Sequence, residues 1–197
     1  ITANIYSLYN SFGEALRQAA FQVGSIITTC GYATTDFDLW PETSKMILVL
    51  LMFIGACAGS TGGGFKISRL LILCKAIPKQ LSLVIHPREV KVIRMDGKPI
   101  DHNTLRSTNV YLAIYFFILL VSTLLISVDN FNLTTNFTAV ASTLNNIGPG
   151  LDGVGPTRNF GMYSDFSKFV LMFDMLAGRL ELYPLLILFM PSLWRRK

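Results

Sequence analysis

The chain has 197 residues, of which 51% are hydrophobic and 15% charged, with a mean hydropathy of +0.48 and a formal net charge of +5. A soluble domain carries about a quarter of charged residues, so this composition indicates a membrane protein and excludes disordered, collagen-like and disulfide-rich secreted chains. Cys30, Cys57 and Cys74 lie far apart without a Cys-x-x-Cys spacing, which excludes a zinc site and a disulfide framework. We expect them to be small apolar side chains in buried helices.

The first apolar segment, residues 15–27, would form a helix of about 20 Å, which is too short to cross a bilayer. It ends in the string Thr28-Thr29-Cys30-Gly31-Tyr32, and acidic sequence follows. Residues 131–144 have a similar length and end in Asn145-Asn146-Ile147-Gly148-Pro149. Non-helical backbone survives at membrane depth only where it lines protein or a watery cavity. The sequence therefore predicts two re-entrant pore loops, each a half-helix followed by an extended strand.

Longer apolar stretches predict membrane-spanning helices. Residues 107–128 contain no charged residue and are long enough for one spanning helix. Residues 46–58 and 67–77 are each too short to span, but together they are long enough. Residues 169–190 form a third span, which three charged residues interrupt: Asp174, Arg179 and Glu181.

The distribution of charge predicts the orientation in the membrane. Nine basic and three acidic residues lie between Lys66 and Arg106, whereas the segments after the predicted pore loops are mainly acidic. Because positive charge stays in the cytoplasm, residues 78–106 and the C-terminus are expected on the cytoplasmic side. The basic residues are thus explained by the orientation of the chain in the membrane, and nucleic acid is not expected as a partner. His86 and His102 lie in the same basic connector and are expected to be solvated or packed.

The chain contains an internal repeat. A shift of 117 residues aligns three identical pairs: Gly31 and Gly148, Val23 and Val140, Ser25 and Ser142. Further on, each copy has a Ser-Lys pair and a glycine ten residues beyond the lysine. The matching order of elements predicts two copies of a helix–re-entrant loop–helix unit, of which residues 1–8 would supply the end of the first leading helix.

The predicted fold class is an all-α polytopic membrane protein of pore-loop repeats. Residues 1–77 would form one repeat, with a glycine-rich break in its inner helix. Residues 78–106 would form the cytoplasmic connector, and residues 107–197 the next repeat and a cytoplasmic tail.

Backbone carbonyls at the end of a half-helix can replace the hydration shell of a monovalent cation, and glycine permits the backbone angles that this requires. The string Thr29-Cys30-Gly31-Tyr32 is similar to the Thr-Val-Gly-Tyr of potassium filters, and the second loop is a degenerate version. The alternative is two ordinary extracellular loops. The predicted ion-binding residues are Thr28, Thr29, Cys30, Gly31, Tyr32, Asn145, Asn146, Ile147, Gly148 and Pro149.

Over nearly its whole length the chain resembles the second half of the Trk/Ktr/HKT superfamily of potassium-uptake proteins, and it looks closest to the bacterial Trk branch. The motifs that carry the resemblance are residues 19–23, 28–37, 58–66, 145–150 and 178–181. The resemblance implies that these are the third and fourth of four repeats around one pore, and that an N-terminal half with two further repeats is missing. It also implies a homodimer in the bacterial inner membrane, surrounded by lipid. A cytoplasmic ring of nucleotide-binding regulatory subunits is implied as a partner, with potassium as the transported ion and no cofactor.

Residues 59–64 contain four glycines. Phosphate binding is not favoured, because Phe65 separates this stretch from Lys66 and Ile67 stands where a nucleotide loop needs Ser or Thr. A plain helix kink is the alternative. The resemblance implies a gate below the filter, for which the candidate residues are Gly59, Ser60, Thr61, Gly62, Gly63, Gly64, Lys66 and Arg179.

Arg179 lies inside an apolar span, where a charge is costly unless it is paired or hydrated. A structural ion pair with Asp174 or Glu181 is the alternative, but their spacing makes them poor partners on a straight helix. Pairing with loop carbonyls near residues 62–64 is favoured.

Three functions from different classes follow. The preferred one is potassium uptake through a gated filter, either channel-like or as a coupled symport. The others are a membrane-embedded enzyme using Asp174, Arg179 and Glu181, and a non-conducting structural membrane subunit. The sequence shows no constellation that we would assign to catalysis, so we predict that the protein is not an enzyme.

Overall fold

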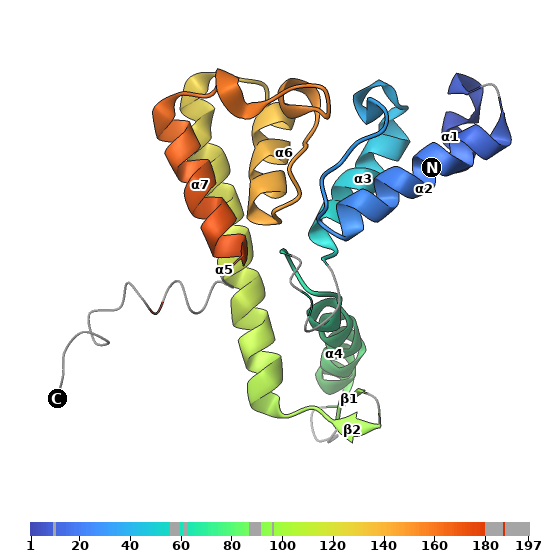
Figure 1. Ribbon diagram of the computed structural model, residues 1–197. Helices are drawn as coiled ribbons and strands as arrows, with labels where there is room; N and C mark the ends of the chain where they lie inside the picture. Colours follow the sequence, from blue (N-terminus) through green and yellow to red (C-terminus); the bar gives the residue numbers. More distant parts are fainter. Residues whose placement is uncertain are drawn as a thin grey trace.

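The computed structural model describes residues 1–9, 11–55, 60, 63–86, 92–95, 97–179 and 187. These residues are mainly helical, as predicted (Figure 1). The helices and strands in chain order are α1 (Thr2–Ile5), η1 (Tyr6–Leu8), α2 (Phe12–Ile27), η2 (Phe37–Leu39), α3 (Glu42–Phe53), α4 (Ile67–Ile85), β1 (Arg94–Met95), β2 (Lys98–Pro99), α5 (His102–Ile126), η3 (Ser127–Asp129), α6 (Leu133–Leu144), η4 (Asp152–Val154), η5 (Phe160–Met162) and α7 (Asp165–Arg179).

Two helical units lie side by side in Figure 1, one built from α1–α3 and the other from α5–α7. Each contains a short helix that ends where the sequence predicts, α2 at Ile27 and α6 at Leu144. Both short helices are capped at their N-termini, because the Ser11 side chain accepts from the Glu14 N–H at 3.2 Å and that of Asn132 accepts from the Thr135 N–H at 2.8 Å. The two predicted half-helices are thus confirmed as separate elements.

Helix α5 is the longest helix described. The segment Asn103–Asp129 is the one helix among the described residues that is long and apolar enough to cross a membrane, and it contains the predicted span 107–128. Its outward side chains include Phe117 and Leu124, which are 67% and 71% exposed. Such a face suits lipid. Of the predicted third span, 169–190, the structure describes residues 169–179 and 187.

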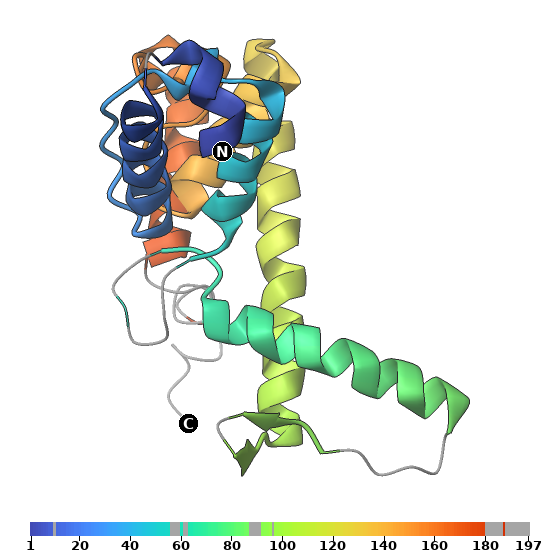
Figure 2. The ribbon, with the colours of Figure 1, turned by 90° about the vertical axis from the view of Figure 1, so that its right-hand side faces the viewer.

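The second predicted span is divided into two helices with different directions. Helix α3 ends at Phe53, and α4 begins at Ile67 and runs across the direction of α5 (Figure 2). The physical reason is the intervening glycine-rich segment, whose two ends are held together by a bridge between Gly55 and Lys66. Helix α4 also continues through Pro78 to Ile85, and the short antiparallel pair β1–β2 precedes α5.

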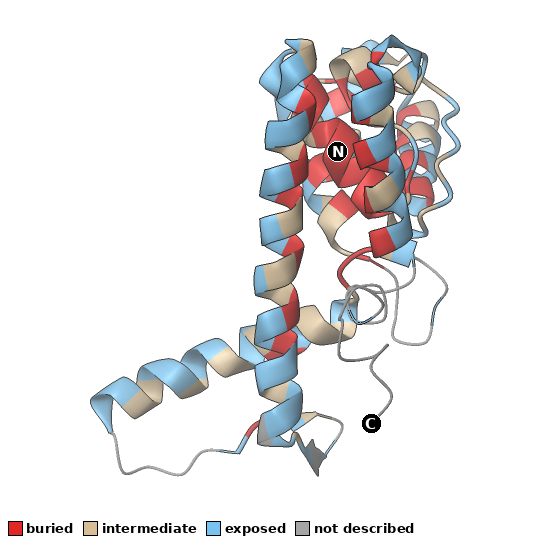
Figure 3. Ribbon diagram, turned by 90° about the vertical axis from the view of Figure 1, so that its left-hand side faces the viewer, coloured by how far each residue is buried: buried red, intermediate tan, exposed pale blue. Residues whose placement is uncertain are grey.

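Figure 3 shows that the buried residues gather in the two helical units, whereas α4 is largely exposed. The buried side chains form two hydrophobic clusters, and each cluster includes residues from outside its own unit. The cluster of α1–α3 includes Ile147 and Leu151 from the loop after α6. The cluster of α5–α7 includes Phe65 from the segment before α4. Each cluster is therefore completed by residues from outside its own unit.

The expectation of buried cysteines is wrong for the two that the structure describes. Cys30 and Cys74 are free and exposed. Cys30 belongs to the strand after α2 and Cys74 to an open face of α4, so neither faces a packed interior. Cys57 lies outside the described residues.

Candidate ion filter

Helices α2 and α6 end in the same backbone hydrogen-bond pattern, offset by 117 residues. After α2, the Thr28 N–H donates to the Gly24 carbonyl (3.0 Å), the Thr29 N–H to the Ile26 carbonyl (3.1 Å) and the Cys30 N–H to the Ser25 carbonyl (2.9 Å). After α6, the corresponding bonds run from the Asn145 N–H to the Ala141 carbonyl (3.1 Å), from the Asn146 N–H to the Thr143 carbonyl (3.0 Å) and from the Ile147 N–H to the Ser142 carbonyl (2.9 Å). The repeat predicted from a few identities is therefore present in the geometry of both loops.

Both loops turn through left-handed backbone at matching positions. Thr29 and Asn146 each have φ of 55°, which is rare for a residue other than glycine and most unusual for the β-branched Thr29. Gly31 and Gly148 follow with φ of 80° and 116°. The conformation is strained for Thr29 but readily adopted by Asn146, and its repetition at matching positions indicates that the loop shape itself has a use.

Two serines brace the loops from behind, and sequence reasoning assigned them no role beyond the repeat. The Ser25 hydroxyl donates to the Tyr32 carbonyl at 2.6 Å, whereas the Ser142 hydroxyl accepts from the Gly148 N–H at 3.0 Å. The signal that could have found them was their alignment by the 117-residue shift.

The two extended strands approach each other closely at the glycines. A Cβ on Gly31 would overlap the backbone carbonyl oxygen of Ile147 and lie 3.4 Å from the Cδ of Pro149. A Cβ on Gly148 would meet only the Cα of Gly31, at 3.9 Å. Gly31 thus has no room for a side chain, while Gly148 has space but an unfavourable φ. The structure brings the two predicted filter segments into direct contact.

Electrostatics at this meeting point favour a cation. The C-terminal end of a helix carries a partial negative charge from its unpaired carbonyls. Each of α2 and α6 ends at the loop that follows it, and the two loops approach each other at Gly31 and Ile147. Carbonyl-rich backbone at two helix C-termini can take the place of water around a monovalent cation.

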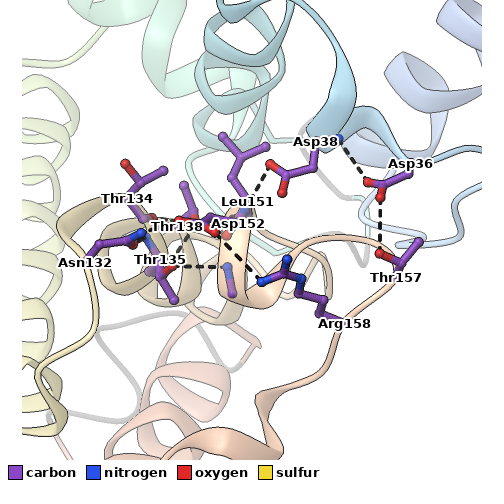
Figure 4. A network of polar contacts seen from close by, with 11 residues as sticks. Asp36, Asp38, Asn132, Thr134, Thr135, Thr138, Leu151, Asp152, Thr157 and Arg158 are labelled. Carbon is purple, nitrogen blue, oxygen red and sulfur yellow. Dashed lines mark hydrogen bonds and ion pairs between the residues drawn. The ribbon is translucent and has the colours of Figure 1, made fainter.

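The outer ends of the two loops are joined by acidic side chains (Figure 4). Asp38 Oδ1 accepts from the Asp152 N–H at 3.0 Å, and Asp36 Oδ2 accepts from the Thr157 hydroxyl at 3.2 Å. An ion pair of 3.9 Å joins Asp152 to Arg158. The acidic residues that follow the two loops, predicted only to face outward, thus connect the two units.

Helix α6 also holds the outer limb of its own loop. The Thr138 hydroxyl accepts from the Leu151 N–H at 3.0 Å, and the Thr135 hydroxyl accepts from the Gly153 N–H at 3.1 Å (Figure 4). These bonds occupy backbone donors that would otherwise be unpaired in a buried loop. The chain between Gly148 and Gly153 is therefore fixed to the helix behind it.

The described end of the glycine-rich segment lies against the base of the second loop. A Cβ on Gly63 would be 2.5 Å from the carbonyl oxygen of Asn145, and one on Gly64 would overlap the Asn145 side chain. The segment closes on itself, because the Gly55 N–H donates to the Phe65 carbonyl at 3.0 Å. Ser60 is exposed and Lys66 partly buried. Gly59, Thr61 and Gly62 lie outside the described residues.

Helix α7 approaches the same base from the other side. A Cβ on Gly178 would overlap the carbonyl oxygen of Leu144, and the Asn146 side chain donates to the Met175 carbonyl at 3.0 Å. Arg179 is exposed and follows Gly178 directly. Asp174 is buried and accepts from the Ser122 hydroxyl at 2.7 Å. Glu181 lies outside the described residues.

The family model described as TrkH, cation transport protein, matches residues 7–196. The chain belongs to the TrkH family. It is 40% identical over 187 residues to the Trk system potassium uptake protein TrkH of Vibrio parahaemolyticus, and 37% identical over 190 residues to that of Escherichia coli K12. These alignments cover 95% and 96% of this chain but 38% and 39% of the relatives.

The fold comparison agrees with the TrkH assignment. The crystal structure of the potassium transporter TrkH from Vibrio parahaemolyticus superposes with a TM-score of 0.88 at 38% identity. The superposition covers 98% of this chain and 42% of the solved one, so the chain spans about two-fifths of the length of its TrkH relatives. The predicted resemblance and the predicted all-α membrane fold are confirmed. Membership of the TrkH family, a family of transport proteins, bears out the prediction that the chain is not an enzyme.

Proposed function

We propose that this chain forms two pore repeats of a potassium uptake protein, which passes potassium ions across the membrane through a carbonyl-lined filter. The observation that carries the proposal is the duplicated hydrogen-bond pattern at the ends of α2 and α6, with glycines at matching places. The names of the relatives, which are potassium uptake proteins, support potassium as the ion.

The ion would be held by the backbone carbonyls of the two loops, residues 28–32 and 145–149. Potassium selection depends on the number and placement of carbonyl dipoles around the ion. The contact between Gly31 and Ile147 supports this role because it brings the two loops together. The hydrogen bonds of Ser25 and Ser142 support it because each fixes a loop to its own helix. No cofactor is needed for such a filter.

The gate would be the glycine-rich segment, residues 59–64, together with Lys66 and Arg179. This assignment is supported by where the described residues of the segment lie. Gly63 and Gly64 lie against the base of the filter at Asn145, and Gly178, next to Arg179, lies against Leu144. A fixed positive charge at this level would oppose cation passage until the segment moves.

Partners and location follow from the resemblance and from charge. Since the relatives are longer than this chain, the pore would include two further repeats from an N-terminal half. The assembly would be a homodimer in the bacterial inner membrane, with residues 78–106 and the C-terminus in the cytoplasm. A ring of nucleotide-binding regulatory subunits would dock on that side.

The test measures rubidium uptake, and its competition by sodium, in liposomes that contain the whole gene product. We expect selective uptake, its loss in Gly31→Ala, a smaller defect in Gly148→Ala, and no change in Gly13→Ala, where a Cβ would meet nothing within 4 Å. Absence of uptake by the unchanged protein would identify a non-conducting subunit instead. Equal uptake by all three variants would overturn the filter assignment.

A further inference from the structure

Asn145, at the C-terminal end of α6, has both side-chain polar atoms bonded in a fully buried position. Its Nδ2 donates to the Ala141 carbonyl at 2.7 Å, one turn back in the same helix. Its Oδ1 accepts from the Tyr115 hydroxyl at 2.9 Å, which comes from α5. The two bonds fix the amide in one orientation, because a buried polar atom left without a partner is costly.

A comparison with the residue that matches Asn145 in the first loop shows which of its two side-chain hydrogen bonds has no counterpart there. Thr28 occupies the position of Asn145 under the 117-residue shift, and its hydroxyl donates to the Gly24 carbonyl at 2.7 Å. This bond is the counterpart of the one from Asn145 to Ala141 and closes the last turn of the helix. The bond to Tyr115 therefore serves something other than ending α6.

The glycine-rich segment meets Asn145 on both its backbone and its side chain. A Cβ on Gly63 would lie 2.5 Å from the Asn145 carbonyl oxygen and 3.2 Å from the Cβ of Asn146, and one on Gly64 would overlap Asn145 Oδ1. Gly64 has φ of 82°, so a side chain there is disfavoured by conformation as well as by space. The oxygen that accepts from Tyr115 is thus the same atom that faces Gly64.

Tyr115 also packs on the segment that carries these glycines. Its ring lies 6.3 Å from that of Phe65 and 6.4 Å from that of Phe53, measured between centroids. Phe65 lies 6.0 Å from Tyr111, over whose ring the Arg69 guanidinium sits at 3.9 Å. A continuous set of contacts runs from the first turn of α4 to the base of the filter.

We propose that Tyr115 and Asn145 are a positioning pair, which sets ion selectivity at the base of the second filter strand and couples it to the glycine-rich segment. The inference rests on the proposed function. The pair holds the Asn145 carbonyl where Gly63 touches it, and a displacement of the segment acts on the filter through that contact. Without the Tyr115 hydroxyl the side-chain amide of Asn145 can rotate, and the backbone carbonyl of the same residue is no longer held in one place. Discrimination between potassium and sodium then falls.

The chain offers a matched control on the same helix. The Tyr163 hydroxyl donates to Asn136 Oδ1 at 2.9 Å, so it is also a buried tyrosine bonded to an asparagine of α6, but at the opposite end from the glycine-rich segment. Burial raises the pKa of Tyr163 to about 12. Tyr115→Phe and Tyr163→Phe each remove one oxygen atom and one buried hydrogen bond.

The experiment compares both variants in the whole gene product by rubidium uptake with sodium competition and by thermal unfolding. We expect both to lose similar thermal stability, and Tyr115→Phe alone to lower potassium-over-sodium selectivity, by about fivefold, as for the loss of one hydrogen bond. If the unchanged protein takes up potassium selectively, an equal potassium-over-sodium selectivity in the two variants would overturn the proposed role of Tyr115 and Asn145. If the unchanged protein shows no such uptake, the proposed function falls and the pair's role with it.

A double-mutant cycle separates the pair from a general loosening of the fold. Asn145→Thr copies Thr28, so it keeps a bond to Ala141 and loses the one to Tyr115. We expect it to reproduce the selectivity loss of Tyr115→Phe, and the double variant to add nothing further. Independent, additive losses would contradict the proposal. If Tyr115→Phe does not reach the membrane, Asn145→Thr decides by the same criterion of selectivity.

Discussion

The carboxylate of Asp38 accepts a hydrogen bond from the backbone N–H of Asp152 across 3.0 Å, and so joins the outer ends of two loops that are 114 residues apart in the chain. Asp38 is only partly buried, yet its partner is a backbone donor in a turn where Asp152 itself has φ of 55°. The bond holds this left-handed turn in place and connects the first repeat to the second.

Replacement of Asp38 by alanine should separate the two loops at their outer ends. The Asp152 N–H loses its acceptor, and we expect a loss of about 1–2 kcal/mol in stability together with reduced potassium uptake. Asp38→Asn should keep most of both, because an amide oxygen can also accept. The control is Asp165→Ala, which removes an exposed carboxylate in the first turn of α7, 3.6 Å from Lys168, and should cost less than about 1 kcal/mol. Thermal unfolding and rubidium uptake of the three variants decide, and equal behaviour of Asp38→Ala and Asp165→Ala would contradict the role of the bond.

Ser25 and Ser142, the two serines that bond to the filter loops, should contribute different amounts to the stability of the fold. Ser142→Ala leaves the N–H of Gly148 without its acceptor, whereas Ser25→Ala leaves the carbonyl of Tyr32, which has a second lone pair. Ser142 is also the more deeply buried of the two. We expect Ser142→Ala to cost about 1–3 kcal/mol and Ser25→Ala less, as measured by thermal unfolding. The reverse order would show that bond length, shorter at Ser25, outweighs the unpaired donor.

Gly178→Ala should move α7 away from α6. The added methyl group would occupy the place of the Leu144 carbonyl oxygen, and the helix would have to shift, which also breaks the bond from Asn146 to the Met175 carbonyl. Such overpacking costs about 1–3 kcal/mol. A lowered unfolding temperature and a lowered yield of folded protein are expected. Val170→Ala, a truncation on the same helix, lies two turns away, and it should destabilise without changing ion selectivity.

Arg179→Ala should raise basal cation flux if the glycine-rich segment and this charge form the barrier. The variant removes a positive charge and a donor of hydrogen bonds, and Arg179→Lys should fall between it and the unchanged protein, since it keeps the charge but loses the planar fork. Arg17→Ala is the charge-matched control, because Arg17 is an exposed residue of α2 whose ion pair with Glu14 spans 3.9 Å. Flux is measured per folded protein and without regulatory subunits. A loss of stability with no rise in flux would identify Arg179 as a structural residue.

The ends of α2 and α6 and the span of α5 were predictable from sequence, because each depends on a local change from apolar residues to glycine or charge. The strand geometry at Gly31 and Gly148 was predictable for the same reason. The roles of Ser142, Tyr115 and Asp38 were not, since each depends on a partner from a distant segment. The direction of α4 was also missed, because hydropathy reports the length of an apolar segment and contains nothing about its angle.

Cys30 shows the same limit at a single residue. Its small apolar side chain suggested a buried position. The backbone N–H groups of Cys30 and Gly31, however, both donate to the Ser25 carbonyl, and in this arrangement the Cys30 side chain lies outside the core. Side-chain direction in an extended strand follows from the backbone angles of the turn before it. Those angles, with Thr29 at φ of 55°, are set by the hydrogen bonds of the finished loop.

The exchange of core residues between the two units has a consequence for biosynthesis. While the first repeat is being made, the pocket that Ile147 and Leu151 later fill has no occupant, and Phe65 has no aromatic partners from α5. The first repeat therefore leaves the ribosome and enters the bilayer before its own interior can be completed. Its final packing is a late event that waits for translation of the second loop, and a polypeptide whose synthesis stops between the repeats stays incompletely packed.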